Sequence, residues 1–143
     1  MLYSNTTHHH EELLWLADED PMQIDITSPC HEILQRFVVA NFYFATNGPR
    51  WTDQSNFLSQ KSVCDWNKNS SGVFCEDGKH VSDIFIQECN LDGTIPHDIG
   101  VLSHMSVLNL SRNILEGNNP VSFGSMDGLK LLDLSTYHLS AID

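Results

Sequence analysis

Histidine and acidic side chains near the N-terminus form the most obvious candidate ligand set of this 143-residue chain. His8-His9-His10 precede Glu11-Glu12, and imidazole and carboxylate groups are good ligands for zinc, copper or nickel. Neighbouring residues rarely complete a tetrahedral site without ligands from elsewhere in the chain. A solvated polar tail explains this run better, and we predict no bound metal and no cofactor.

The sequence shows no arrangement of residues that is typical of a catalytic site. The other histidines fall in separate sequence units and are His31, His80, His97, His104 and His138. The sequence contains no HExxH motif, no phosphate-binding glycine loop, no CxxC pair and no serine nucleophile elbow. We therefore predict that the chain is not an enzyme.

A 24-residue repeat organises the C-terminal part of the chain, residues 81–143. Its apolar columns include Val81/Met105/Leu129, Ile84/Leu108/Leu132, Ile86/Leu110/Leu134 and Leu91/Leu115/Leu139. Such a period is the signature of a solenoid, whose units bury their apolar faces only against one another. We predict repeats at 81–104 and 105–128 and an incomplete one at 129–143.

Each repeat contains a short strand with one buried face. Ile84-Phe85-Ile86, Leu108-Asn109-Leu110 and Leu132-Asp133-Leu134 alternate apolar and other residues with period two. Three residues further on, the amide of Asn113 can bond backbone groups of its loop and of the next coil. Cys89 occupies the same column and is predicted to be a buried thiol that bonds the loop backbone.

The strand residues that alternate with the core columns form an outward face, which is the candidate binding surface. Concave solenoid faces serve as extended interaction surfaces because one column projects repeatedly along a rigid strip. Phe85 is the outlier there: it either forms an apolar stripe with Val107 and Leu131 or is partly covered by the preceding segment. The candidate residues are Asp83, Phe85, Gln87, Glu88, Val107, Asn109, Ser111, Arg112, Leu131 and Asp133.

The segment before the repeats, residues 27–80, is predicted to be an N-terminal cap. Its helix is expected over about 28–46, with Ser28 as N-cap, Pro29 at the first helical position and a stop at Asn47-Gly48-Pro49. The expected buried face carries Ile33, Leu34, Phe37, Val38, Ala40, Phe42 and Ala45, and the opposite face carries Glu32, Gln35 and Arg36. Residues 1–26 are predicted to be a mostly disordered acidic arm with a helical turn or two.

Charge and hydropathy exclude several classes of partner. The net charge of −12, the pI near 4.8 and only seven basic residues argue against nucleic acid and anionic membrane surfaces. No run of about 18 apolar residues is present, so we predict no membrane insertion by this segment. The N-terminus lacks the order of a secretory signal, which indicates either a cytosolic chain or a piece of a longer protein.

The repeats resemble the plant-type leucine-rich repeat, LxxLxLxxNxLxGxIPxxLGxL. Residues 81–102 read VSDIFIQECNLDGTIPHDIGVL, residues 105–126 read MSVLNLSRNILEGNNPVSFGSM, and residues 129–143 read LKLLDLSTYHLSAID. Asn119, Tyr137 and Ala141 depart from the pattern. Residues 64–75, CDWNKNSSGVFC, resemble the CxWxGVxC motif of the family's N-terminal caps, with extra residues before Gly72. The fold class expected is therefore an α/β leucine-rich repeat solenoid with a helical cap.

The resemblance implies a Cys64–Cys75 disulfide, with Trp66 packed over the first coil. Closing such a loop contributes roughly 3 kcal/mol in the chain-entropy model, whereas a cytosolic location would leave both cysteines reduced. Three Asn-x-Ser/Thr sequons, at Asn5, Asn69 and Asn109, are glycosylation candidates if the chain is secreted. Asn69 lies in the cap insertion and is the best of them.

By resemblance, the chain is expected to be a protein- or peptide-binding module from the N-terminal part of a receptor-like signalling ectodomain. Such ectodomains continue into further repeats and a membrane span, which this segment lacks. Two alternatives remain: a truncated structural or assembly fragment, and an intracellular leucine-rich repeat scaffold.

Overall fold

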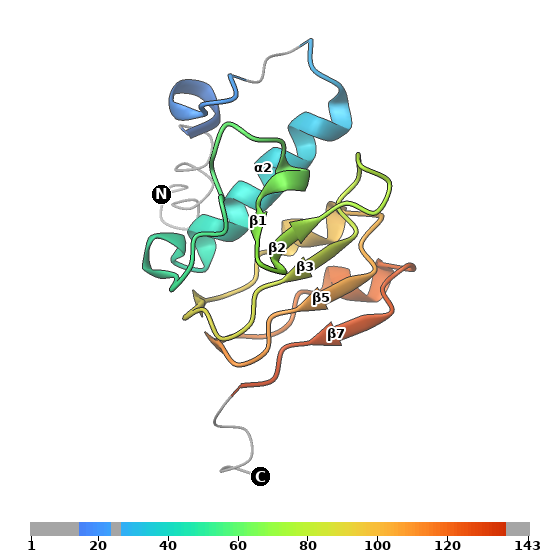
Figure 1. Ribbon diagram of the computed structural model, residues 1–143. Helices are drawn as coiled ribbons and strands as arrows, with labels where there is room; N and C mark the ends of the chain where they lie inside the picture. The colour runs from blue at the N-terminus through green and yellow to red at the C-terminus, as the bar shows by residue number, and fades with distance from the viewer. Residues whose placement is uncertain (1–14, 24–26, 137–143) are drawn as a thin grey trace, which may run out of the picture.

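The computed structural model describes residues 15–23 and 27–136, and one helix packs against a layer of short strands (Figure 1). The helix, α2 (Cys30–Ala45), lies beside the strands, and the repeats follow one another away from it toward the C-terminus. The predictions that concern His8–His10, Asn5, Tyr137 and Leu139 lie outside the described residues.

The main sheet joins the cap to the repeats. Its order is β1 (Asn67–Lys68), β2 (Ser71–Phe74), β3 (Asp83–Phe85), β5 (Val107–Asn109) and β7 (Leu131–Asp133). The last three strands are parallel and pair Asp83 with Val107 and Val107 with Leu131, so each strand is one 24-residue step from the next. The strands begin one residue earlier than predicted, and the Ile86 amide still donates to the Asn109 carbonyl at 2.9 Å.

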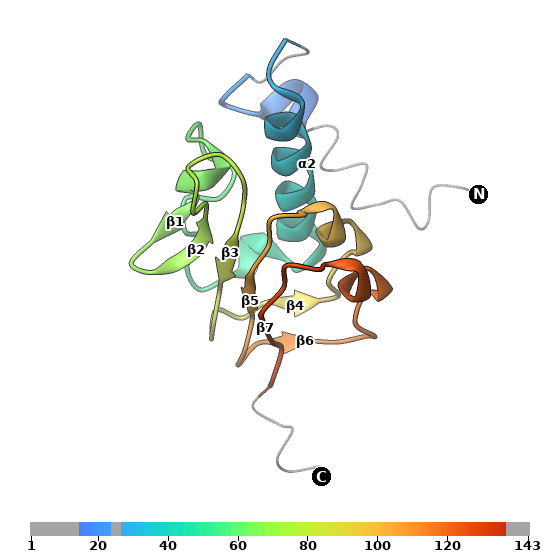
Figure 2. The same ribbon diagram turned by 90° about the vertical axis from the view of Figure 1, so that its right-hand side faces the viewer.

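Each coil returns to the sheet through a second, smaller layer (Figure 2). β4 (Asp92–Gly93) pairs in parallel with β6 (Ile114–Leu115), and the 3-10 helices η4 (His97–Val101) and η5 (Val121–Ser125) follow Pro96 and Pro120. Gly93, at a φ of +105°, brings β4 against the end of α2, where a side-chain Cβ would lie 2.4 Å from the Ala45 carbonyl. The first coil is therefore seated directly on the cap helix.

The predicted apolar columns form the core of the first two coils. Ile84, Ile86, Leu91, Leu108 and Leu110 are fully buried. Their counterpart in the third coil, Leu132, is 39 % exposed, because among the described residues no further coil covers it.

The amide of Asn113 links two coils, as the repeat pattern predicts, but it faces the preceding coil and not the next one. Its Oδ1 accepts from the amides of Cys89 and Leu91 at 2.9 and 3.1 Å. Its Nδ2 donates to the carbonyls of Ile86 and Leu110 at 2.7 and 2.9 Å. Cys89 is a buried thiol that donates to the Gln87 carbonyl at 3.2 Å, which confirms its predicted role.

Helix α2 differs from its prediction in its start and in its polar face. Pro29 is the N-cap residue and Cys30 the first helical one, so placing Ser28 as N-cap was wrong. Gln35 and Arg36, predicted to face solvent, are buried, whereas Leu34 is 45 % exposed. Gln35 bonds the Lys79 carbonyl and the Val81 amide, and burial is compensated by these bonds.

The end of the acidic arm contains the expected helical turn, and this part of the arm is packed against the cap. Trp15 begins a π-helical turn, η1 (Trp15–Glu19), and is buried. Asp20 is fully buried against Arg36, with Oδ2 at 2.6 Å from the guanidinium Nε. Arg36 lies between two indoles, 5.2 Å from the ring centre of Trp15 and 4.8 Å from that of Trp66. The buried guanidinium of Arg36 thus holds the end of the arm against the cap through the carboxylate of Asp20.

The cap insertion is a β-hairpin and not an irregular loop. Asn69 and Ser70, between β1 and β2, both have positive φ, at 50° and 70°, which is the conformation of a two-residue hairpin turn. The disulfide Cys64–Cys75 closes the base of this hairpin. Trp66 is fully buried, and its ring contacts are with Trp15 and Phe57. Short 3-10 turns at Gly48–Arg50 and Val63–Asp65 complete the cap.

Among the described residues, no helix has the length and apolar character needed to span a bilayer.

Candidate functional site

The outward face of the main sheet carries the predicted binding residues on three neighbouring strands. Successive side chains of a strand alternate between the two faces of the sheet. The residues on either side of Ile84, Leu108 and Leu132 therefore lie on the face opposite the core. We call this surface the strand face. It consists of Asp83 and Phe85 on β3, Val107 and Asn109 on β5, and Leu131 and Asp133 on β7; Gln87, Glu88, Ser111 and Arg112 follow the strand ends.

The register corrects the predicted apolar stripe. Phe85 is level with Asn109, and Val107 and Leu131 are level with Asp83. Phe85 therefore meets Val107 only diagonally. Its aromatic partner is Phe74 on β2, with ring centres 6.0 Å apart at 69°, so the cap partly covers it. Of the two alternatives for Phe85, an apolar stripe or partial cover by the cap, the structure shows partial cover by the cap.

A groove runs along the cap side of the strand face. Its volume is about 490 Å³, and it is lined by Ser70, Phe74, Asp83, Phe85 and Gln87. Phe74 and Ser70 were not among the predicted site residues, because the repeats begin only at Val81 and both residues precede it. The alternation around the buried Val73 was a usable signal, since it places Phe74 on a strand that can extend the sheet. The groove thus combines two aromatic rings with an acidic and an amide side chain.

Asp83 is the charged group of this groove. Partial burial raises the pKa of its carboxyl group, and the negative charge of Glu76 raises that pKa further. The ionised carboxylate is therefore held at some energetic cost in the free protein. A cationic or hydrogen-bond-donating ligand group would relieve that cost.

Several other predicted site residues serve the fold. The Asn109 side chain accepts from the Ser111 amide at 3.2 Å, and Asp133 accepts from the Ser135 amide at 3.1 Å and from its hydroxyl group at 2.7 Å. These bonds from Ser135 lower the pKa of Asp133. Ser111 is buried and accepts from Gln87 at 2.8 Å. These contacts fix the strand ends and leave less of them free for a ligand.

Glu88 and Arg112 lie one repeat apart at the end of the strand face. Their carboxylate and guanidinium are 3.7 Å apart, and both side chains are well exposed. An exposed pair of this kind contributes little to stability. Both side chains are therefore free to reorient toward a ligand.

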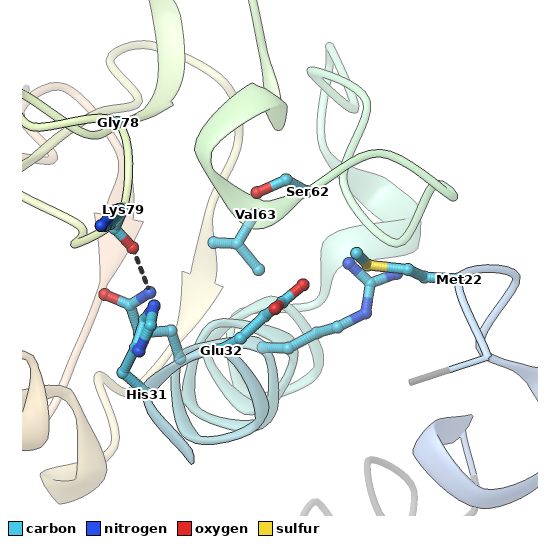
Figure 3. Close-up of a pocket in the computed structure, with 9 residues that line it drawn as sticks. Met22, His31, Glu32, Ser62, Val63, Gly78 and Lys79 are labelled. Carbon is cyan, nitrogen blue, oxygen red and sulfur yellow. Dashed lines mark hydrogen bonds between the residues drawn. The ribbon is translucent and has the colours of Figure 1, made fainter. Parts of the chain in front are cut away.

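A second, smaller cavity lies at the N-terminal end of α2 (Figure 3). It measures about 160 Å³ and its lining includes Met22, Glu32, Ser62 and Lys79. Figure 3 shows the hydrogen bond that joins the helix to the Lys79 carbonyl, at 3.0 Å from the Gln35 amide nitrogen. The lining is mostly polar, and the bond between Gln35 and Lys79 ties the helix to the loop before β3, so we assign this cavity a structural role within the cap.

The modification candidates occupy different surroundings. Asn69 is exposed at the hairpin turn, beside the groove residue Ser70. Asn109 is half-buried on β5, with its amide oxygen already bonded. Glycosylation at either position remains a prediction. Cys30 is a free, exposed thiol at the start of α2.

The fold and the strand face together define a leucine-rich repeat segment with an N-terminal cap. The chain is 30 % identical over 120 residues to Phytosulfokine receptor 1 of Arabidopsis thaliana, and these residues make up 80 % of this chain and 11 % of that receptor. The similarity confirms the resemblance to a plant leucine-rich repeat receptor-like ectodomain. The chain thus spans about a ninth of this relative's length.

Among solved structures, the chain matches one titled "Crystal structure of PEPR1-AtPEP1", with a TM-score of 0.41 and 29 % identity over 48 % of this chain and 9 % of that chain. No protein-family model matches the sequence.

Proposed function

We propose that this chain is a non-catalytic, extracellular module that binds a peptide or protein through the strand face. The observation that carries the proposal is the groove in which Phe74 and Phe85 present aromatic surface beside Asp83 and Gln87. Aromatic anchors surrounded by polar groups are the usual composition of binding hot spots. The apolar rings supply contact area, and the polar groups select for orientation.

The groove lies where an extended segment can run across several repeats. Val107 and Leu131 continue from Asp83 along the register, and Leu131 is 46 % exposed. A ligand with one apolar side chain in the groove can thus place further side chains on β5 and β7. Repeated columns on a rigid sheet suit an extended peptide better than a small molecule.

The similarity to a receptor and the cap disulfide support an extracellular location. Disulfides persist in oxidising compartments and are rare in the cytosol. We infer that the chain belongs to the N-terminal part of a longer signalling receptor, attached to the membrane by a segment outside this sequence. The phytosulfokine of the relative's name belongs to that receptor, and no ligand is carried over from it here.

Selection from a displayed random-peptide library against the purified chain tests the binding surface. We expect enriched peptides whose affinity falls at least tenfold for Phe85→Asp. The matched control is Val121→Asp, since Val121 is 85 % exposed on η5, away from the strand face. Thermal unfolding of both variants shows that they are folded. Failure to enrich any peptide, or equal affinity for Phe85→Asp and wild type, contradicts the proposal.

An assembly role is the second candidate, and the third coil favours it. Leu131 and Leu132 are both more than a third exposed on β7, the last strand of the main sheet in the described part of the chain. Light scattering over a range of concentrations separates this role from ligand binding. A concentration-dependent increase in mass, lost in Leu132→Asp, supports assembly, whereas a monomer at all concentrations leaves peptide binding as the function. The intracellular-scaffold alternative requires Cys64 and Cys75 to be reduced.

A further inference from the structure

Two histidines that lie one repeat period apart stack on one another, contrary to the prediction that they are separate. His80 and His104 have ring centres 4.0 Å apart and planes 14° apart. The reason is the repeat itself: the two residues are one 24-residue step apart, each three residues before a paired strand position, Asp83 or Val107. Equivalent residues on neighbouring strands lie about 4.8 Å apart. The same register that aligns the core therefore aligns these imidazoles.

A carboxylate completes the cluster from the cap. Asp77 Oδ2 lies 2.7 Å from His80 Nδ1, and one ligand atom from each of Asp77, His80 and His104 lies within 4.8 Å of the others. The three side chains share a cavity of about 350 Å³ with Glu76 and Ser82. This cavity is separate from the groove of the strand face, because the two share no lining residue.

The loop that carries Asp77 and His80 is held in place on both sides. Gln35 accepts from the Val81 amide at 2.7 Å and donates to the Lys79 carbonyl, the bond drawn in Figure 3. The Asp77 carboxylate accepts from the amides of Lys79 and His80 at 2.8 and 2.7 Å. These bonds position the ligand atoms before any ion arrives, which reduces the entropy lost on binding.

We propose that Asp77, His80 and His104 bind one divalent transition-metal ion of the zinc type at the junction of cap and first repeat. Two imidazoles and one carboxylate are ligands that Zn²⁺ accepts, whereas Mg²⁺ and Ca²⁺ prefer oxygen alone. Ligand atoms of a tetrahedral zinc site lie about 3.4 Å apart, so the widest separation, within 4.8 Å, has to close by up to about 1.4 Å and the 2.7 Å contact between His80 and Asp77 has to open. The side chains of His80 and Asp77 are 29 % and 48 % exposed, so they have room to do so.

The fourth coordination position is open to solvent. Glu76 lines the same cavity and offers a carboxylate that can fill it, as can water. The bound ion links His80 and Asp77 of the cap to His104, which lies in the loop before β5. Zinc binding therefore stabilises the contact between cap and repeats, by an amount that grows with free zinc concentration.

Zinc titration of the full chain by calorimetry tests the site, provided that the N-terminal histidine run is removed first. His8, His9 and His10 are replaced by alanine in every sample, so that their imidazoles cannot contribute to the measured stoichiometry. We expect one Zn²⁺ per chain with a Kd tighter than about 100 µM. His104→Gln is expected to weaken binding at least tenfold.

The matched control is His97→Gln, because His97 is an exposed histidine on η4 outside the cluster. Its zinc affinity is expected to equal that of the parent. His104 is itself exposed, so both variants should unfold at the parent's temperature in EDTA. Zn²⁺ is expected to raise the unfolding temperature of the parent and of His97→Gln but not of His104→Gln, and Mg²⁺ to raise none. No saturable one-to-one binding, or equal binding by His104→Gln and His97→Gln, overturns the proposal.

Discussion

At the scale of residues, the most consequential contact is the buried ion pair of Asp20 and Arg36. Both side chains have no exposed surface. The guanidinium also donates to the carbonyls of Ser59 and Lys61, at 2.7 and 2.9 Å. An ion enclosed in this way depends on its counter-charge, because without it a buried cation remains uncompensated.

Replacement of Asp20 by asparagine is therefore expected to lower the free energy of unfolding by about 3 kcal/mol. Urea unfolding followed by circular dichroism measures the change. Asp18→Asn is the control, since Asp18 is an exposed acidic residue of η1, two residues before Asp20, and should shift stability by less than about 0.5 kcal/mol. Equal stability of the two variants contradicts a structural role for the Asp20–Arg36 pair.

Asp83 provides a pH-dependent test at the groove. Its pKa is raised in the folded chain, so the folded state binds more protons than the unfolded state between about pH 3.9 and the folded pKa. Over that window the contribution of Asp83 to stability falls as the pH rises. Asp83→Asn should consequently stabilise the protein at pH 7, by roughly a few tenths of a kcal/mol since the group is partly solvated. The gain should vanish near pH 3.

Thermal unfolding of wild type and Asp83→Asn at the two pH values measures this difference. The natural control is Asp133→Asn, because hydrogen bonds from Ser135 lower the pKa of Asp133 and give the opposite sign. A stabilisation by Asp83→Asn that persists unchanged at pH 3 contradicts desolvation of the carboxylate as its cause.

At the scale of elements, the register of the repeats could be predicted because it depends on a column pattern that the sequence displays directly. Ile84, Leu108 and Leu132 are 24 residues apart and lie on adjacent strands as expected. The stacking of His80 on His104 follows from the same period. It was missed because these residues were considered as single histidines and not as a column.

The cap was harder to predict, since its contacts join residues with no periodic relation. The partner of Arg36 is 16 residues earlier, and a helical-wheel pattern alone places a charged residue on the solvent side. The hairpin that brings Phe74 to the groove depends on two consecutive positive-φ residues, Asn69 and Ser70, without the glycine that usually marks such a turn. Both features depend on tertiary contacts.

The link between coils depends on one side chain, Asn113, and is testable by its removal. Asn113→Ala leaves the buried amides of Cys89 and Leu91 and the carbonyl of Ile86 without their partner. We expect a loss of about 3 kcal/mol or more, because each unsatisfied buried group costs about 1–3 kcal/mol. Asn118→Ala, at an exposed position of the same repeat, is the control in a urea unfolding series. A loss below 1 kcal/mol for Asn113→Ala contradicts this role.

At the scale of the whole molecule, the cap and the first two coils form one continuous core, and the third coil is its open side. The core runs from Trp15 through Trp66 and Ile84 to Leu108, whereas Leu132 stays partly exposed. A ligand bound across the strand face would contact both the well-packed cap side and the open third coil. The groove between Phe74 and Phe85 is on the better-packed side, which suits a rigid recognition surface.

The proposed extracellular, receptor-like role depends most directly on the redox state of Cys64 and Cys75, which the structure joins in a disulfide. The deciding measurement is a non-reducing peptide map of the protein isolated from its own cells, with free thiols alkylated at lysis. We predict a linked peptide pair containing Cys64 and Cys75, with Cys30 and Cys89 alkylated. Alkylated, unlinked Cys64 and Cys75 would contradict an extracellular ectodomain and make the intracellular scaffold the better explanation.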